Sequence, residues 1–186
     1  MLKYNFGSNK KNIDGYINVD ALDLEGVDVV HDLSKVPYTF TDSNKVDEIK
    51  AEEFLEHIPF NQAYPMLKEW YRILKPGGLL RIQVPDCGKA MEYYVKGQIC
   101  ECCAHKPKSD KDAMANPDCF TCGGNGKINP TRWLLSFTGA QKHPWDYHLN
   151  IFTKERLEDL LKSAGFNDIG HEEDKYGWKL KFTCLK

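Results

Sequence analysis

Long apolar runs are missing from this sequence, and so is an excess of charge of either sign. No stretch approaches the roughly 18 consecutive apolar residues that a transmembrane helix needs. The first residues, MLKYNFGSNKK, lack the apolar core of a signal peptide. The formal net charge of -2 gives no electrostatic reason for tight, non-specific binding to nucleic acids or membranes. These absences predict a cytoplasmic protein without a membrane partner. A nucleic-acid partner is possible, but the net charge does not indicate one.

The length and the cysteine content together predict one domain with an insert. A chain of 186 residues has the length of a single domain. Its seven cysteines are many for this length, and five of them lie between Cys100 and Cys122. An odd number of cysteines without a signal peptide argues against a disulfide framework and favours metal binding. We therefore expect a single domain over residues 1–186 that contains a cysteine-rich insert at residues 97–130.

Short apolar runs alternate with amphipathic segments along the chain. Strands are predicted at residues 2–6, 16–19, 27–30, 46–51, 79–84 and 178–185. Helices are predicted at residues 54–58, 63–74 and 154–164, the last with Thr153 as its N-cap and Gly165 at its end. Strands that alternate with helices indicate an α/β fold, with a doubly wound, mostly parallel sheet. The last strand is expected to be antiparallel to its neighbours.

Two local features refine this fold prediction. The segment between Gly7 and Tyr16 is shorter than the dozen or so residues usual for a parallel crossover. The first helix is therefore predicted to be a turn or little more. The apolar run at residues 79–84 is typical of a strand that is covered on both faces, which agrees with a doubly wound sheet.

Three features at the ends of the first strands suggest a ligand pocket, because ligands in open α/β sheets bind beyond the carboxyl ends of the strands. Gly7 and Ser8 close the first strand, where a glycine lets a ligand approach the backbone. Asp20 closes the second strand, where a carboxylate could accept both ribose hydroxyls of an adenosine. Asp32 and Leu33 follow the third strand, near where an adenine would lie. Each feature alone is more often a turn or a cap, so the prediction depends on their order.

Several longer strings resemble the class I S-adenosylmethionine (SAM) dependent methyltransferase superfamily, in particular its small type 11-like branch. They are NFGSNKKNIDGYINVD, DVVHDL, VDEIKAEEFLEHIPF and LKEWYRILKPGGLLRIQVPD, followed later by HLNIFTKERLEDLLKSAGF. The resemblance covers residues 1–86 and 148–166. It implies a Rossmann-like fold, SAM as cofactor and a methyl acceptor of unknown class. It also implies the contacts with SAM: Gly7 and Ser8 on the methionine part, Asp20 on the ribose, and Asp32 and Leu33 near the adenine.

An acidic and histidine-containing segment follows the fourth predicted strand. On a helix, Glu53 would share one face with Glu56 and His57, because these follow at i+3 and i+4. His148 could complete a set that holds a divalent cation such as Mg²⁺ or Mn²⁺, which would bind an acceptor hydroxyl and lower its pKa. The ExxEH spacing with a distant histidine resembles metal-dependent O-methyltransferases of small RNAs and of the ubiquinone pathway. Without a metal, these side chains would fix the helix or line the pocket, and His148 could be a general base or a packed residue.

The cysteine-rich insert has the spacing of a tetrahedral, four-thiolate zinc site. The predicted ligands form two CxxC pairs: Cys100, Cys103, Cys119 and Cys122. Cys102 could replace either member of the first pair. Four protein ligands leave no open position, so this zinc would be structural. Cys87 and Cys184 are expected to be ordinary buried residues.

The leading hypothesis is an enzyme, a SAM-dependent methyltransferase that modifies an oxygen of a small molecule, a sugar or a nucleic-acid ribose. Its catalytic residues would be Glu53, Glu56, His57 and His148. The alternative is a non-catalytic binding module of the same fold, whose zinc knuckle docks a protein or RNA partner. A nicotinamide-binding protein is disfavoured because no GxGxxG follows the first strand.

Overall fold

The computed structural model describes residues 1–96, 135–174 and 177–186. The predicted insert and its zinc ligands lie outside these residues, so the zinc site stays a prediction. The described strands form a seven-stranded sheet in the order β3-β2-β1-β4-β5-β7-β6. The bounds of the strands are Lys3–Phe6 (β1), Ile17–Asp20 (β2), Val29–Val30 (β3), Val46–Glu52 (β4), Leu74–Pro85 (β5), Asn167–Glu173 (β6) and Lys179–Leu185 (β7).

The helices are fewer than the strands in the described parts of the chain. The α-helices are Ala63–Ile73 (α1), Cys87–Lys96 (α2) and Lys154–Ala164 (α5), and the short 3-10 helices are Leu55–His57 (η1) and Pro144–Asp146 (η2). Helix α5 begins after Thr153, whose hydroxyl accepts from the Arg156 amide, and ends at Gly165 in the left-handed region, as predicted. Strand β6 and helix α2 were not predicted. No described helix is long and apolar enough to cross a membrane.

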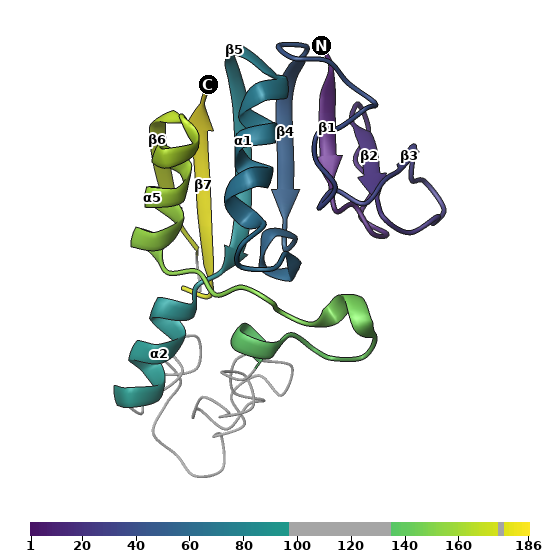
Figure 1. The fold of residues 1–186 in the computed structure, drawn as a ribbon. Helices are drawn as coiled ribbons and strands as arrows, with labels where there is room; N and C mark the ends of the chain where they lie inside the picture. Colours follow the sequence, from purple (N-terminus) through teal and green to yellow (C-terminus); the bar gives the residue numbers. More distant parts are fainter. Residues whose placement is uncertain (97–134, 175–176) are drawn as a thin grey trace, which may run out of the picture.

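The strand order confirms the predicted reversal of the winding. Strands β3, β2, β1, β4 and β5 are parallel neighbours, and β7 runs antiparallel to both β5 and β6. From β1 the chain therefore moves outward in one direction to β3 and then returns to add β4 and β5 on the other side. The carboxyl ends of the parallel strands lie at the lower edge of the sheet in Figure 1.

The described helices that pack on the sheet lie on one face, whereas helices on both faces are typical of a doubly wound sheet. Figure 1 shows α1 and α5 side by side in front of the sheet, with α2 beyond its lower edge. Residues 7–45, which connect β1, β2, β3 and β4, contain no helix. The expectation that the first crossover is only a turn is thereby confirmed, and the next two connections are also loops.

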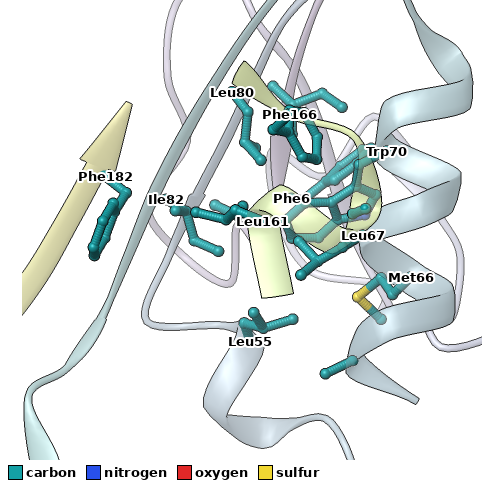
Figure 2. Packing of buried hydrophobic residues seen from close by; sticks show 14 of the residues in the cluster. Phe6, Leu55, Met66, Leu67, Trp70, Leu80, Ile82, Leu161, Phe166 and Phe182 are labelled. Atoms are coloured by element: carbon teal, nitrogen blue, oxygen red, sulfur yellow. The ribbon is translucent and has the colours of Figure 1, made fainter. Parts of the chain in front are cut away.

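The apolar core lies between the sheet and these two helices. Trp70 and Leu67 of α1 and Leu161 of α5 are fully buried, and they pack against strand residues that include Phe6 and Ile82 (Figure 2). Because side chains alternate along a strand, alternate residues of the paired stretches contribute to this layer. They are Tyr4 and Phe6 of β1, Ile49 and Ala51 of β4, Leu80, Ile82 and Val84 of β5, and Leu180, Phe182 and Cys184 of β7. Cys184 of β7 is one of them, and it is buried as predicted, as is Cys87.

The loop between β3 and β4 takes the place of a helix over one part of this core. Tyr38 is buried, and its hydroxyl accepts from the indole N–H of Trp70 at 2.9 Å while it donates to the Leu33 carbonyl. The Tyr38 amide donates to the carboxylate of Glu69 on α1 at 2.7 Å. These bonds hold the loop on α1, so the edge of the core is closed without a further helix.

The opposite face of the sheet is polar. Lys3, Glu48 and Arg81 lie on neighbouring strands, where Glu48 forms ion pairs with Lys3 at 2.8 Å and with Arg81 at 2.9 Å. The prediction that residues 79–84 are covered on both faces is wrong, since Arg81 is exposed and Gln83 half-buried between buried apolar neighbours. A sheet that is covered on one face needs apolar side chains only at alternate positions.

Candidate functional site

The chain turns sharply where β4 ends, at the carboxyl edge of the sheet. Glu53 has a φ of 53°, in the left-handed region that few non-glycine residues adopt. The following helix η1 is a single turn over Leu55–His57, shorter than the predicted helix at residues 54–58. The turn directs Glu56 inward, with 2% of the residue exposed. Within the described part of the chain, neither carboxylate oxygen of Glu56 has a hydrogen-bond partner.

A second segment, residues 147–152, crosses beneath η1 on its way to α5 (Figure 1, green). The backbone amides of Leu149 and Asn150 both donate to the Glu56 carbonyl, at 2.8 and 3.0 Å. This attachment brings His148 next to His57, with ring centroids 5.0 Å apart. Backbone hydrogen bonds thus bring together two residues that are far apart in the sequence.

Glu56, His57 and His148 form the one compact group of potential metal ligands among the described residues. One ligand atom from each lies within 4.8 Å of the other two. Three of the four residues predicted as the catalytic set therefore come together. The arrangement can bind a divalent cation or, through an imidazole, accept a proton from a bound hydroxyl.

The hydrogen bonds of the two imidazoles fix which ring nitrogen is available. Nδ1 of His57 lies 3.0 Å from the Tyr147 carbonyl, and Nδ1 of His148 lies 3.0 Å from the Ser136 carbonyl. Because a carbonyl oxygen can only accept, we assign the hydrogen of each neutral ring to Nδ1. Nε2 of both rings then carries a free lone pair. Backbone carbonyls on the far nitrogen are the usual support of metal-binding histidines.

The electrostatics of the group reflect the lack of a positive partner. Burial, reinforced by the nearby Glu53, raises the pKa of the Glu56 carboxyl well above its ordinary value. Burial also lowers the pKa of His57, and the neighbouring His148 lowers it further, against the opposing effect of the bond to Tyr147. His57 is therefore kept neutral, the form in which imidazole binds metals or accepts protons.

Glu53, the fourth member of the predicted set, lies outside the group. Its carboxylate accepts from the Gln83 amide at 3.0 Å and forms an ion pair with Lys179 of β7 at 3.3 Å. The prediction placed Glu53 on one helix face with Glu56, whereas the left-handed turn at Glu53 precedes the single helical turn and removes this relation. Glu53 thus ties β4 to β5 and β7.

The residues predicted to hold the methionine part of SAM lie at the end of β1. The amides of Gly7 and Ser8 both donate to the Val19 carbonyl, at 2.9 and 3.2 Å, so neither amide is left to bind a ligand. Gly7 has a φ of 67°, and a Cβ on it would collide with the ring of Phe54. Ser8 is 1% exposed, and its hydroxyl has no hydrogen-bond partner among the residues that the structure describes. The Ser8 hydroxyl is therefore the group here that is free to bind a ligand.

Asp20 occupies the predicted position at the end of β2. Its Oδ2 accepts from the Asn9 amide at 2.8 Å, and its Oδ1 accepts from the Leu22 amide at 3.0 Å. These two bonds hold the carboxylate between the loops that follow β1 and β2. Each oxygen can accept more than one hydrogen bond, so the fixed carboxylate can still accept from ribose hydroxyls.

Asp32 and Leu33, predicted near the adenine, follow β3. Oδ1 of Asp32 accepts from both the amide and the hydroxyl of Ser34, at 3.0 and 2.6 Å, which closes a turn. The Leu33 side chain is buried in the core and its carbonyl accepts from Tyr38. A contact of Leu33 with an adenine would therefore involve its backbone amide.

A network of buried polar side chains fixes the short loop between β1 and β2. The Asn5 side-chain amide donates to Lys11 O and to Asn18 Oδ1, both at 2.9 Å. Asn18 Oδ1 also accepts from the Ile13 amide at 3.1 Å, while the Asn18 backbone donates to Asp28 at 2.7 Å. These bonds hold the loop in place where a helix is missing, so the end of β1 remains ordered for a ligand.

Asn150 is a candidate site residue that the sequence analysis missed. It is 4% exposed, its Oδ1 accepts from the Ile151 amide, and its Nδ2 has no partner. The sequence WDYHLNIF contained a signal for this residue. Side chains two residues apart in an extended segment point to the same side, so Asn150 is expected on the side of His148. Buried groups without partners are rare, and those of Glu56 and Asn150 lie on the two segments that the backbone bonds join.

Residues 12–82 match a protein family described as a methyltransferase domain, and no curated protein sequence matches the chain. Among solved structures, the chain is similar to a SAM-dependent methyltransferase from Archaeoglobus fulgidus. The two share 14% identity and a TM-score of 0.60 over 99% of this chain and 85% of that one. It is also similar to 1,6-didemethyltoxoflavin-N1-methyltransferase from Burkholderia thailandensis, solved with S-adenosylhomocysteine, at 14% identity and a TM-score of 0.55 over 100% and 70%.

A third similar structure is a possible exported protein from Bordetella parapertussis, with 16% identity and a TM-score of 0.57. All of this chain aligns with it, but the chain spans only 61% of that protein's length. The shared fold is the Rossmann-like α/β fold found in SAM-dependent methyltransferases. The domain match and this fold support the prediction of an enzyme of this class with SAM as its cofactor. A methyl acceptor is implied, and its class is unknown.

Proposed function

We propose that this chain is a SAM-dependent O-methyltransferase in which Glu56, His57 and His148 bind and activate the acceptor hydroxyl. The observation that supports this most strongly is the Glu56 carboxylate, which is 2% exposed and lacks a partner. Leaving such a group unpaired costs free energy. Its retention beside two histidines at the carboxyl edge of the sheet favours a site that is completed by a ligand.

The residues that follow β1, β2 and β3 fit SAM. We assign the Ser8 hydroxyl to the methionine part, the Asp20 carboxylate to the ribose, and Asp32 with the Leu33 backbone to the adenine. The buried Ser8 hydroxyl has no hydrogen-bond partner among the described residues and is therefore available to a ligand. Asp20 is held by two loop amides, so its carboxylate is oriented before the cofactor arrives. SAM, when bound, supplies an electrophilic methyl group, whose transfer to the acceptor oxygen leaves S-adenosylhomocysteine and releases the hydroxyl proton.

The acceptor hydroxyl would be held by the three side chains of the group. Its proton can leave to the free Nε2 of an imidazole, because the Nδ1 bonds to Tyr147 O and Ser136 O orient both rings. A divalent cation at this position would lower the pKa of the hydroxyl. The free Nδ2 of Asn150 supplies a hydrogen-bond donor on the same segment. A hydroxyl group both accepts and donates a hydrogen bond, so the Asn150 amide and the imidazole nitrogens together suit an oxygen nucleophile.

Calorimetric titration with SAM and S-adenosylhomocysteine tests the cofactor assignment. We expect both to bind, and we expect Asp20→Ala to weaken binding by roughly tenfold or more, because a hydrogen bond to a charged group contributes about 1.5–3 kcal/mol. Asp23→Ala is the matched control, since Asp23 follows the same strand and is exposed. If neither compound binds to the folded protein, the proposed function is wrong.

The assignment to oxygen is tested by transfer of a labelled methyl group to a panel of alcohols, phenols, sugars and amines. We expect label in O-methyl products and loss of that label in His148→Ala. Label found in N-methyl products alone would show that the acceptor atom is nitrogen, while leaving the SAM-dependent activity in place.

A further inference from the structure

One guanidinium near the carboxyl edge of the sheet has no part in the proposed function so far. Arg156 lies in the first turn of α5, which begins at this edge (Figure 1). Its Nη1 donates to the Ile151 carbonyl, and its Cζ lies 4.8 Å from the ring centroids of both Phe60 and Phe152. These contacts position the guanidinium but use little of its hydrogen-bonding capacity, because an arginine side chain has five N–H donors.

Arg156 differs from the other two arginines that the structure describes in having no acidic partner there. Arg72 is paired with Glu69 at 2.6 Å, and Arg81 with Glu48 at 2.9 Å. Burial lowers the pKa of Arg156, and the opposing effect comes from a thiol rather than from a carboxylate. Because a guanidinium stays charged even when it is partly buried, Arg156 carries a positive charge that no described carboxylate neutralises.

The place of Arg156 on its helix also disfavours an unpaired cation. Arg156 is the third residue of α5, and the N-terminus of a helix carries a partial positive charge. A cation in the first turn therefore lowers the stability of the helix unless an anion lies beside it. The same partial charge attracts anions, so the end of the helix and the guanidinium favour the same kind of ligand.

The guanidinium lies close to the group formed by Glu56, His57 and His148. Ile151, which accepts from Arg156, directly follows Asn150, whose backbone amide donates to the Glu56 carbonyl at 3.0 Å. A thiol reports the same proximity. Burial raises the pKa of Cys87 to about 11, and Glu56 raises it further while Arg156 lowers it. Both side chains are thus near enough to one thiol to affect its ionisation.

We propose that Arg156 binds an anionic group of the methyl acceptor, a carboxylate or a phosphate, while the acceptor hydroxyl lies at Glu56, His57 and His148. This inference rests on the proposed function and deepens it, because it names the substrate class: a hydroxyl compound that carries an anionic group. A planar guanidinium can donate two parallel hydrogen bonds to either anion. Phe60 and Ile151, which contact Arg156, are 70% and 42% exposed and offer an apolar surface to the rest of the acceptor.

The surroundings of Glu56 limit its repulsion of an anionic acceptor. Burial, reinforced by the nearby Glu53, raises the pKa of the Glu56 carboxyl and favours its uncharged form. A divalent cation at this position would cancel the remaining negative charge. Arg156 then supplies the charge that the anionic group of the acceptor meets.

The test is the binding of benzoate and phenyl phosphate to the full chain, measured by nuclear magnetic resonance of the ligand protons. The titrations are run with and without S-adenosylhomocysteine, and benzyl alcohol is the neutral comparison. We expect at least one anion to bind about tenfold or more tightly than benzyl alcohol. Binding of benzoate alone would assign a carboxylate, and binding of phenyl phosphate alone a phosphate. If neither anion binds, or if benzyl alcohol binds equally well, the inference is wrong.

Two substitutions at Arg156 and one control identify the binding group. Arg156→Gln should weaken anion binding by about tenfold or more, because it removes charged hydrogen bonds. Lys154→Gln is the matched control, since Lys154 is an exposed cation in the same helical turn, and it should change binding by less than about threefold. Equal losses in Arg156→Gln and Lys154→Gln would show a diffuse effect of charge and overturn the inference.

Arg156→Lys keeps the charge and the apolar stem, so it carries the test if Arg156→Gln does not fold. The folding of each variant is checked by circular dichroism. Arg156→Lys should still weaken anion binding by more than about threefold, because an ammonium group cannot reproduce the planar pair of hydrogen bonds. Unchanged binding in folded Arg156→Lys would overturn the paired contact on which the inference depends.

Binding of S-adenosylhomocysteine separates this inference from the proposed function. If S-adenosylhomocysteine binds and neither anion does, the substrate class is wrong and the methyltransferase assignment remains. If an anion binds through Arg156 and S-adenosylhomocysteine does not bind, the anion site is supported and the proposed function fails. Displacement of S-adenosylhomocysteine by either anion would assign Arg156 to the carboxylate of the cofactor and overturn the inference.

Discussion

Two buried glutamates occupy opposite surroundings in this molecule. Glu48 lies on the polar face of the sheet, 7% exposed, and its two oxygens are paired with Lys3 and Arg81. Glu56 lies at the carboxyl edge and is 2% exposed, and its carboxylate has no hydrogen-bond partner in residues 1–96, 135–174 and 177–186. The two residues are of the same type and similarly buried, so the difference lies in what surrounds them.

The two glutamates differ in whether charged side chains pair with the buried carboxylate. A buried carboxylate that is paired contributes to stability, and one that is unpaired lowers it. On the polar face the charges on neighbouring strands satisfy one another. At the carboxyl edge the polar groups of Glu56, Ser8 and Asn150 are buried and unsatisfied. Under the proposed function, a bound ligand would satisfy these groups.

The largest expected effect is on catalysis, in Glu56→Gln. Methyl transfer should fall on the order of 100-fold, because the substitution removes the charge that orients the acceptor or its cation. The melting temperature of the metal-free protein should not fall, because burial raises the pKa of Glu56 and favours its uncharged carboxyl, which a neutral amide of similar size replaces. Initial rates and thermal unfolding measure the two effects. A strongly destabilised Glu56→Gln would show that the carboxylate has a structural partner.

A smaller effect is expected on stability, in Glu48→Gln. Burial raises the pKa of Glu48, but hydrogen bonds from Lys3, Tyr16 and Arg81 outweigh it, so the pKa lies below its ordinary value of 4.5. The native state therefore gains stability from the ionised carboxylate above pH 4.5 and loses it as the pH falls through the lowered value. Near neutral pH the substitution should cost about 1–2 kcal/mol, because the ion pairs are partly exposed.

Denaturant unfolding at several pH values measures this loss. The difference between Glu48→Gln and the unchanged protein should shrink as the pH falls below 4.5, because the carboxylate of the unchanged protein becomes protonated. A difference that stays constant with pH would mean that packing, and not charge, makes Glu48 important.

The smallest effect is expected in Glu52→Gln, on the same face as Glu48. Glu52 pairs with Lys50 at 3.0 Å, but its side chain is 39% exposed. Exposed pairs of this kind contribute little, so the free energy of unfolding should change by less than about 0.5 kcal/mol. If Glu52→Gln lowers the free energy of unfolding as much as Glu48→Gln does, burial does not explain why the two residues differ.

Sequence patterns predicted the elements whose signals are local. Helix α5 was predicted with its observed bounds, because Thr153 and Gly165 mark its ends. Helix α1 and the strands β1, β2, β4 and β7 were predicted to within a few residues, although β5 starts earlier and β3 is shorter than expected. Strand β6 was missed because most of its residues are exposed, which leaves no apolar alternation to recognise.

The candidate site was predicted in part, because its residues act through distant contacts. Glu56, His57 and His148 were named from the sequence, and the chain brings them together. Glu53 was misplaced, since nothing in its neighbours along the chain indicates a left-handed turn. Asn150 was overlooked, since its burial follows from the bond between its backbone and Glu56.

Residue order alone was enough to predict the α/β class and the bounds of most strands and helices, because strand ends, helix caps and glycines are local signals. The residues that it named for a cofactor pocket stay a prediction. Contacts between distant segments decided that the described helices cover one face, that Glu48 is paired and that Glu56 is not. The reason is physical: a side chain's partners depend on which strands and loops lie beside it, and these come together only when the chain folds.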